Sequence, residues 1–258
     1  MSTPTPYYDE AGISIYHGDC LAVLPYIEEV DIAVTSPPYN MGLVPGGNGR
    51  GMYRPGANNK GGRFREGYGT HDDAMEQGSY DEWQREVLTV LFGTVRLGIF
   101  YNHRPRVEHG RLRTPLSFDF GPDLNPFLRQ IIVWDRGTGI DVNLRNFCTR
   151  GEWIMVFAKP EFALVDHSAS GMGDVWRLGA EHNKKIGHPA PFPISLPGRC
   201  IDTTGATSVV DPFMGSGTTL RAARDRGVKA IGIEIEERYC EIAAKRLAQE
   251  VLDFGGAA

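Results

Sequence analysis

The sequence has few cysteines and no long hydrophobic run. Its four cysteines among 258 residues lie far apart and form no Cys-x-x-Cys pair, which argues against a zinc site and against a disulfide framework. No stretch approaches the roughly 20 apolar residues of a membrane span. Residues 1–10 lack the basic and apolar regions of a secretory signal. We therefore expect a cytoplasmic protein with reduced thiols, no metal site and no membrane segment.

An excess of positive charge is also missing. Lysine and arginine total 27 against 32 acidic residues, which gives a formal net charge of −5. A protein that binds nucleic acid over its whole surface would be basic, so any such contact here requires local positive charge. Residues 42–69 supply one basic segment, with ten glycines and with Arg50, Arg54, Lys60, Arg63 and Arg65 against one acid. Residues 102–115 supply a second, with Arg104, Arg106, Arg111 and Arg113.

Short apolar runs alternate with helical patterns along most of the chain. This alternation predicts an α/β fold with a mostly parallel sheet that is covered on both faces. The expected strands are Ile13–His17, Asp31–Val34, Gly98–Tyr101, Ile131–Trp134, Trp153–Ala158, Ser208–Val210 and Lys229–Glu234. The expected helices are Cys20–Ile27, Asp81–Leu97, a short one near Gly198–Ile201, Thr218–Arg226 and Glu237–Val251.

A glycine-rich turn, Asp211–Thr219, joins an expected strand to an expected helix. Gly215 and Gly217 allow a tight turn and a close approach of a ligand to the backbone. Glu234 ends the next strand, where an acid can accept hydrogen bonds from ribose hydroxyls. No Gly-Lys-Ser/Thr and no Gly-x-Gly-x-x-Gly is present, which argues against ATP and against a Rossmann NAD site. The alternative is a glycine turn in an ordinary βαβ unit.

A second motif, Ser36-Pro37-Pro38-Tyr39, follows another expected strand. Open α/β sheets place their ligands at the carboxyl ends of strands. The two prolines stiffen the backbone, Ser36 adds a hydroxyl acceptor and Tyr39 adds an aromatic plane. Together they suit an amino group on a flat heterocycle. The alternative is a rigid surface turn.

The two motifs together resemble those of the S-adenosylmethionine-dependent DNA amino-methyltransferases, which modify exocyclic nitrogens. Ser36–Tyr39 matches the catalytic motif of that family and Asp211–Thr219 matches its cofactor loop, in the order of the β group. Weaker matches are Gly18-Asp19, Glu152–Lys159 and residues 188–193. The resemblance implies a permuted seven-stranded, Rossmann-like methyltransferase sheet in one catalytic domain, residues 1–258. Residues 42–78 and parts of 102–150 would be inserted target-recognition segments.

The resemblance also implies roles for single residues. Ser36 and the Pro37 carbonyl would accept hydrogen bonds from the target amine, and Tyr39 would stack on a flipped base, so that Ser36, Pro37, Pro38 and Tyr39 form the catalytic motif. The cofactor, S-adenosyl-L-methionine, would contact Asp19, His188, Phe192, Asp211, Phe213, Gly215, Ser216, Gly217, Thr218 and Glu234. The two basic segments would contact double-stranded DNA. A homodimer and a restriction nuclease acting on the same site are left open.

The first residue of the catalytic motif bears on the target base. Family members with Asp-Pro-Pro-Tyr usually methylate adenine N6, whereas those with Ser-Pro-Pro-Tyr usually methylate cytosine N4. We therefore predict direct, in-line methyl transfer to cytosine N4 within a specific DNA site. None of the four cysteines follows a proline, as the nucleophile of cytosine-C5 enzymes does. Adenine N6, an RNA or protein-glutamine acceptor, and a catalytically silent DNA- or cofactor-binding module are the alternatives.

Overall fold

A computed structural model describes residues 4–40, 75–108, 110–137, 147–179 and 192–248. The basic segment 42–69, with its five predicted DNA contacts, lies outside the described residues, as does His188. The second basic segment is described except for residue 109.

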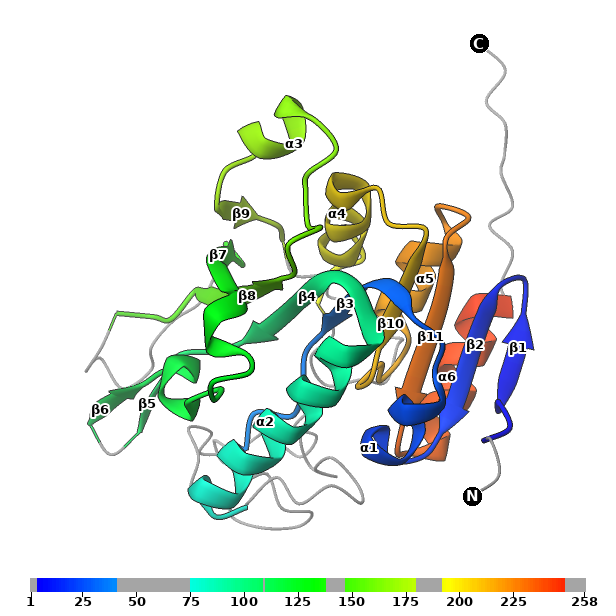
Figure 1. The fold of residues 1–258 in the computed structure, drawn as a ribbon, viewed down its shortest axis with the longest axis horizontal. Coiled ribbons are helices and arrows are strands. Elements are labelled where there is room, and N and C mark those ends of the chain that lie inside the picture. Colours follow the sequence, from blue (N-terminus) through cyan, green and yellow to red (C-terminus); the bar gives the residue numbers. More distant parts are fainter. Residues whose placement is uncertain (1–3, 41–74, 109, 138–146, 180–191, 249–258) are drawn as a thin grey trace, which may run out of the picture.

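A nine-stranded sheet passes through the described residues in the order β1-β2-β11-β10-β3-β4-β8-β7-β9 (Figure 1). All seven expected strands are present, and two short strands that were not expected, β1 and β9, extend the sheet at its edges. The bounds are β1 Tyr8–Glu10, β2 Ile13–His17, β3 Val30–Thr35, β4 Val95–His103, β7 Leu128–Asp135, β8 Gly151–Ala158, β9 Val175–Arg177, β10 Ser208–Asp211 and β11 Lys229–Glu234. The separate strands β5 (Arg106–Glu108) and β6 (Arg111–Arg113) form a hairpin.

The centre of the sheet is parallel, as the alternating pattern predicts. Strands β2, β11, β10, β3 and β4 all run in one direction. Strand β8 is antiparallel to both of its neighbours, and β1 is antiparallel to β2. The expected permuted order is confirmed, because the C-terminal strands β10 and β11 lie between the N-terminal strands β2 and β3.

Helices cover both faces of this sheet (Figure 1). Their bounds are α1 Cys20–Val23, α2 Gln77–Thr94, α3 His167–Gly171, α4 Ser195–Thr204, α5 Thr218–Arg224 and α6 Glu237–Ala248. Helices α1 and α2 pack on the face that contains Ala33, whereas α4, α5 and α6 pack on the face that contains Ile32 and Val34. Successive side chains of a strand point to opposite faces, so β3, which is buried along its whole length, contributes to both cores.

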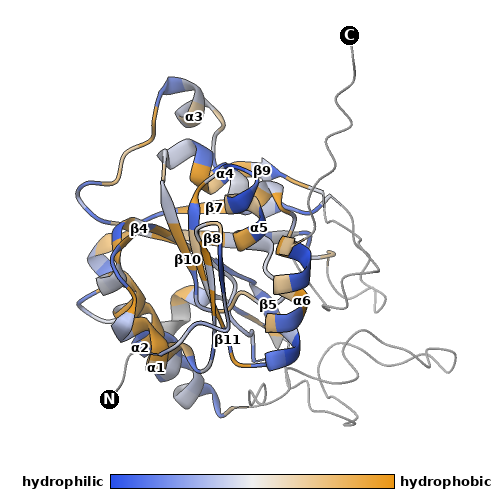
Figure 2. Cartoon of the chain, turned by 90° about the vertical axis from the view of Figure 1, so that its right-hand side faces the viewer, coloured by the Kyte–Doolittle hydropathy of each residue, from blue (hydrophilic) through white to orange (hydrophobic). Residues whose placement is uncertain are grey.

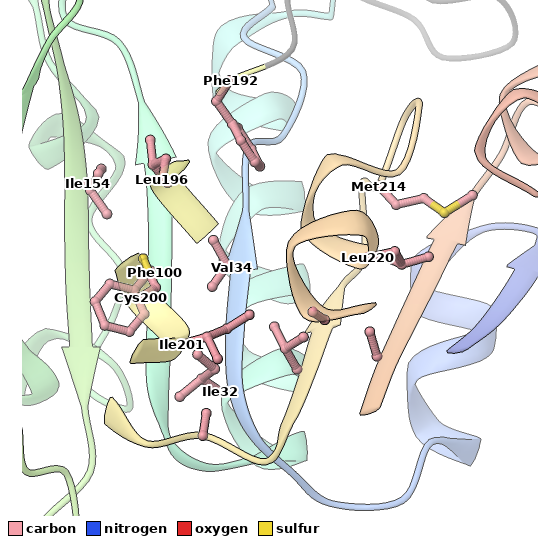
Figure 3. Packing of buried hydrophobic residues seen from close by; sticks show 14 of the residues in the cluster. Ile32, Val34, Phe100, Ile154, Phe192, Leu196, Cys200, Ile201, Met214 and Leu220 are labelled. Atoms are coloured by element: carbon pink, nitrogen blue, oxygen red, sulfur yellow. The ribbon is translucent and has the colours of Figure 1, made fainter. Parts of the chain in front are cut away.

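The core beneath α4 shows how an apolar stripe attaches a helix to the sheet. Leu196, Cys200 and Ile201 of α4 are at most 3% exposed and lie in one core cluster with Ile32 and Val34 of β3 and Phe100 of β4 (Figure 3). Such burial supplies most of the free energy that holds a helix in place. Hydrophobic residues concentrate on the strands, while α6 carries hydrophilic residues along its visible surface (Figure 2). Among the described residues, no helix is long and apolar enough to cross a membrane.

The predicted C-terminal end of the long helix before β4 is wrong. The helical pattern was expected to continue to Leu97, but α2 ends at Thr94 and the next residue begins β4. Val95 has extended backbone angles, is fully buried and pairs with Val30 of β3. Pairing at the centre of the sheet thus overrides a helical periodicity that this segment shares with the helix before it.

The chain leaves β3 and β10 in opposite directions. From β3 it returns through α2 to β4 on one side, and from β10 it returns through α5 to β11 on the other. Because β3 and β10 are paired neighbours, their carboxyl ends form the topological switch point at which open α/β sheets bind ligands. The Ser36–Tyr39 motif follows β3, and the glycine loop follows β10.

Close packing of β4 against β8 generates a stability prediction. A Cβ atom added at Gly98 would lie 2.4 Å from the Phe157 carbonyl oxygen, so Gly98→Ala is expected to lower the free energy of unfolding by about 1–3 kcal/mol. Gly93→Ala is the matched control, because nothing lies within 4 Å of its added Cβ and alanine in a helix gains up to about 1 kcal/mol over glycine. Urea unfolding followed by circular dichroism measures both. Equal stability of the two variants would contradict the packing argument.

Candidate active site

The carboxylate of Asp211, at the end of β10, joins three segments. Its Oδ1 accepts from the Thr35 hydroxyl at 2.9 Å and from the Phe213 backbone N–H at 3.1 Å, and its Oδ2 accepts from the Thr219 hydroxyl at 2.6 Å. Asp211 is 1% exposed, and burial raises the pKa of its carboxyl to about 6. The end of β3, the loop after β10 and the start of α5 are therefore held together at one buried group.

The glycine loop depends on backbone conformations that other residues adopt with strain. Gly217, which precedes α5, has φ +78°, and a Cβ atom there would lie 2.9 Å from the Ala243 Cβ of α6. Gly215 also has positive φ. Between them, Ser216 is buried, and its hydroxyl and carbonyl accept from the Arg246 guanidinium. The loop therefore follows the surface of α6 closely, and Thr218 begins α5 from a buried position.

Glu234, at the end of β11, lies against the same loop. Its Oε2 accepts from the Gly215 backbone N–H at 3.0 Å, and its Oε1 accepts from the Glu236 backbone N–H at 2.9 Å. Burial is the largest influence on this carboxyl and raises its pKa to about 7. A ligand that donates hydrogen bonds to the Glu234 carboxylate would therefore stabilise its ionised form.

Three other predicted cofactor residues have clear surroundings. Phe213 is partly buried, and the centroid of its ring lies 5.6 Å from the ring centroid of Trp83 on α2. Phe192 is buried in the same cluster as Leu196 (Figure 3). Asp19 is exposed and caps α1, because its Oδ1 accepts from the Leu21 backbone N–H at 2.8 Å.

The Ser36–Tyr39 motif is tied together by its own side chains. The Ser36 Oγ and the Tyr39 hydroxyl lie 2.8 Å apart. The Tyr39 hydroxyl also lies 2.9 Å from Asn102 Oδ1 and 3.3 Å from Glu152 Oε2. The Tyr39 carbonyl accepts from Arg106 at 2.5 Å. The motif is thus a hydrogen-bonded loop attached to β4, β8 and the β5–β6 hairpin.

A buried polar network holds the motif from the side of α2. The Tyr80 hydroxyl donates to the Pro38 carbonyl at 2.6 Å, accepts from the Gln84 side chain at 2.9 Å and lies 3.0 Å from His103 Nε2. His103 Nδ1 accepts from the Arg104 backbone N–H, so Nε2 carries the proton and donates to Tyr80. Burial lowers the pKa of His103 to about 3, which keeps the ring neutral.

The four predicted DNA contacts of the second basic segment differ in their surroundings. Arg111 is exposed and Arg113 is half-buried, both on β6. Arg106, on β5, donates to Tyr39 and to Gln77. Arg104 is half-buried. This hairpin therefore begins directly beside the Ser36–Tyr39 motif.

Sequence reasoning missed several residues that surround the motif. Gln84 was expected only as part of a helix and Asn102 only as part of a basic loop, while Tyr80 was given no assignment. The sequence marks these residues only weakly, as polar side chains at helix or strand positions that are otherwise apolar. Arg136 pairs with Glu152 at 3.0 Å. No group of three or more candidate metal ligands occurs within the described residues.

This fold is that of solved DNA methyltransferases. The cytosine-N4-specific PvuII DNA methyltransferase superposes with a TM-score of 0.71 at 20% identity, over 96% of this chain and 90% of that chain. TTHA0409 of Thermus thermophilus, solved with S-adenosyl-L-methionine, superposes with a TM-score of 0.62 at 23% identity, over 93% and 96% of the two chains.

A DNA methylase family model for N6- and N4-methyltransferases matches residues 30–245. The chain therefore belongs to this family of S-adenosylmethionine-dependent DNA methyltransferases. M.ScaI of Streptomyces caespitosus, a type II methyltransferase, is 27% identical over 95% of this chain and 84% of its own length. The DNA adenine methyltransferase YhdJ of Escherichia coli K12 is 26% identical, over 95% and 85%.

The Tyr80 network generates a second prediction. Tyr80→Phe leaves the Gln84 and His103 donors and the Pro38 carbonyl without their shared partner. We expect the free energy of unfolding to fall by about 1–3 kcal/mol. Tyr26→Phe, at a side chain with 37% exposure, is the control and is expected to change it by less than about 0.5 kcal/mol. A Tyr80→Phe protein as stable as the Tyr26→Phe protein in urea would argue against this network.

Proposed function

We propose that this protein methylates cytosine N4 within a specific site of double-stranded DNA. The observation that carries the proposal is the Ser36 hydroxyl in a Ser-Pro-Pro-Tyr motif at the switch point, next to the glycine loop. The N4 specificity named for the PvuII enzyme supports it. Methylation of adenine N6 is the second candidate, which the name of YhdJ favours.

The residues around the glycine loop fit the family's cofactor by their chemistry. S-adenosylmethionine is a cation with ribose hydroxyl donors. Burial raises the pKa of the Asp211 and Glu234 carboxyls, and a ligand with positive charge or hydroxyl donors stabilises their ionised forms. In this proposal Glu234 accepts from the ribose hydroxyls. Around the methionine part lie Asp211, Phe213, Gly215, Ser216, Gly217 and Thr218, while Asp19, His188 and Phe192 complete the site.

The catalytic motif acts on the amine of a flipped base. The lone pair of an exocyclic amine is delocalised into the ring, so the amine is a poor nucleophile until it becomes pyramidal. Acceptance of its N–H groups by Ser36 Oγ and the Pro37 carbonyl favours that form, and the ring of Tyr39 supports the base by stacking. The chemistry that the bound cofactor supplies is an electrophilic methyl group. Holding the amine in line with it is the task of the rigid Pro37-Pro38 backbone.

The two basic segments are proposed to bind DNA phosphates. Arg111 and Arg113 belong to the β5–β6 hairpin, whose Arg106 contacts the Tyr39 carbonyl, so phosphate contacts there would be coupled to the motif. Arg104 and the cations of residues 42–69 complete the proposed DNA contacts. A restriction nuclease of the same site is proposed because M.ScaI and M.BglII are named type II methyltransferases. A homodimer is proposed on the β-group resemblance alone.

Analysis of the product tests the proposed reaction. Unmethylated DNA is incubated with the protein and S-adenosylmethionine, then digested, and its nucleosides are identified by mass spectrometry. We expect N4-methylcytosine, and its loss with Ser36→Ala because that variant removes an acceptor for the amine. Ser79→Ala, at an exposed position in the first turn of α2, is expected to retain the product.

Each other result points to a different conclusion. Detection of N6-methyladenine alone would contradict the cytosine N4 assignment and favour adenine N6 as the target. Labelled methyl groups in RNA or in protein glutamine, with none in DNA, would contradict the DNA substrate. Absence of cofactor binding would indicate a catalytically silent module.

The raised pKa of Glu234 predicts that cofactor affinity depends on pH. Ribose hydroxyls donate to the ionised carboxylate, so a protonated Glu234 has to lose its proton before binding. Because its pKa is about 7, the Kd is expected to rise by about tenfold from pH 8 to pH 6. Isothermal titration calorimetry with S-adenosylmethionine measures this change.

Two variants identify the titrating group. Glu234→Gln should bind more weakly and lose the pH dependence, because the amide does not titrate. Glu237→Gln, at an exposed position in the first turn of α6, should retain the dependence of the wild type. Equal pH dependence in wild type and Glu234→Gln would assign the titration to another group.

A further inference from the structure

The Ser36 hydroxyl presents either its proton or its lone pairs to a substrate. Which of the two it presents depends on its hydrogen bond to the Tyr39 hydroxyl, 2.8 Å away. Either oxygen is able to donate in this bond. If Tyr39 donates, the proton of Ser36 points elsewhere and is available to the substrate. If Ser36 donates, its proton is occupied and its lone pairs remain.

The partners on the other side of Tyr39 settle this direction. Asn102 donates its Nδ2 to the Trp153 carbonyl at 3.2 Å, which turns its Oδ1 toward the Tyr39 hydroxyl at 2.9 Å. An amide oxygen only accepts. Asn102 is 2% exposed, so its amide is largely shielded from water.

Glu152 presents a second acceptor to the same hydroxyl. Its Oε2 lies 3.3 Å from the Tyr39 oxygen, while its Oε1 pairs with the Arg136 guanidinium at 3.0 Å. A carboxylate paired with arginine accepts and does not donate. The Tyr39 hydroxyl has one proton, and both of these neighbours require it. The Tyr39 oxygen is therefore left to accept from Ser36.

We propose that Asn102 and Glu152 are positioning residues that direct the hydrogen bonds through Tyr39, so that Ser36 presents lone pairs and not its proton to the target amine. This inference rests on the proposed function. A Ser36 that donated to the amine nitrogen would occupy the lone pair that attacks the methyl group. A Ser36 that accepts an amine N–H leaves that lone pair free for the reaction.

Through this chain of hydrogen bonds, the neutral Ser36 hydroxyl acts toward the substrate only as an acceptor, as a carboxylate does. An ionised aspartate at this position would have acceptors only and would need no such hydrogen-bond chain. Serine has a proton that must be directed away from the substrate, and the chain from Glu152 and Asn102 through Tyr39 performs this task. The Tyr39 ring and its hydroxyl therefore have separable roles.

A double-mutant cycle tests the inference. Tyr39→Phe retains the ring and removes the hydroxyl, while Asn102→Leu removes the acceptor at similar volume. Tyr39→Phe is expected to lower the single-turnover rate of tritiated methyl transfer to unmethylated plasmid DNA by about tenfold. Asn102→Leu is expected to lower it by a smaller factor, because Glu152 Oε2 still accepts from the Tyr39 hydroxyl at 3.3 Å. KM for DNA and for S-adenosylmethionine should change little. Since Asn102 acts through Tyr39, the double variant should be no slower than Tyr39→Phe.

Controls separate this effect from misfolding. Asn125→Leu, whose side chain bonds only to an exposed Asp119 carboxylate in the described structure, should retain the wild-type rate. If Asn102→Leu does not fold, Glu152→Gln replaces it in the cycle, because it substitutes an amide for a carboxylate that only accepts.

A double variant slower than Tyr39→Phe by the full factor that Asn102→Leu costs alone, with wild-type DNA methylation intact, would overturn this inference alone. A Tyr39→Phe variant at the wild-type rate would do the same. A wild-type protein that transfers no methyl group to DNA would overturn the proposed function first, and this inference with it.

Discussion

The buried carboxylate of Asp211 is the group on which the arrangement of the site depends. It accepts hydrogen bonds from Thr35, Thr219 and the Phe213 backbone, and burial raises its pKa. A buried carboxylate is costly unless its lone pairs are satisfied, so these three donors and the carboxylate constrain one another. Because Thr35 and Asp211 are 176 positions apart, one interaction aligns two motifs that the chain itself separates widely.

The Ser36–Tyr39 motif is held at several points, each from a different element. Thr35 connects its start to Asp211, the Tyr80 hydroxyl fixes the Pro38 carbonyl, and Arg106 and Asn102 engage Tyr39. Satisfied polar networks in a buried environment are rigid because each lost hydrogen bond leaves a group unsatisfied. A motif with so little freedom suits a reaction whose acceleration depends on positioning. The proposed chemistry thus depends on residues outside the two motifs.

Much of the fold follows from local pattern. The seven expected strands are apolar runs ended by glycine, proline or polar residues, and burial on both faces makes such runs conspicuous. Strands β1 and β9 were missed because each has three residues that are mostly exposed at a sheet edge. Their extended form comes from pairing with a neighbour and not from their composition. The end of α2 was misplaced for the same reason, since Val95 extends only because Val30 pairs with it.

The sequence by itself determined the two motifs: their identity and order, the glycines of the loop and the acid at Glu234. Only the tertiary structure decided which side chains complete the site. Asn102 and Glu152 lie 63 and 113 positions from Tyr39, and Tyr80 lies 42 positions from Pro38. Spacing along a chain carries no information about strand order or register. The physical reason that these residues meet is that a parallel sheet gathers the carboxyl ends of its strands at one edge, where hydrogen bonds select among the groups brought there.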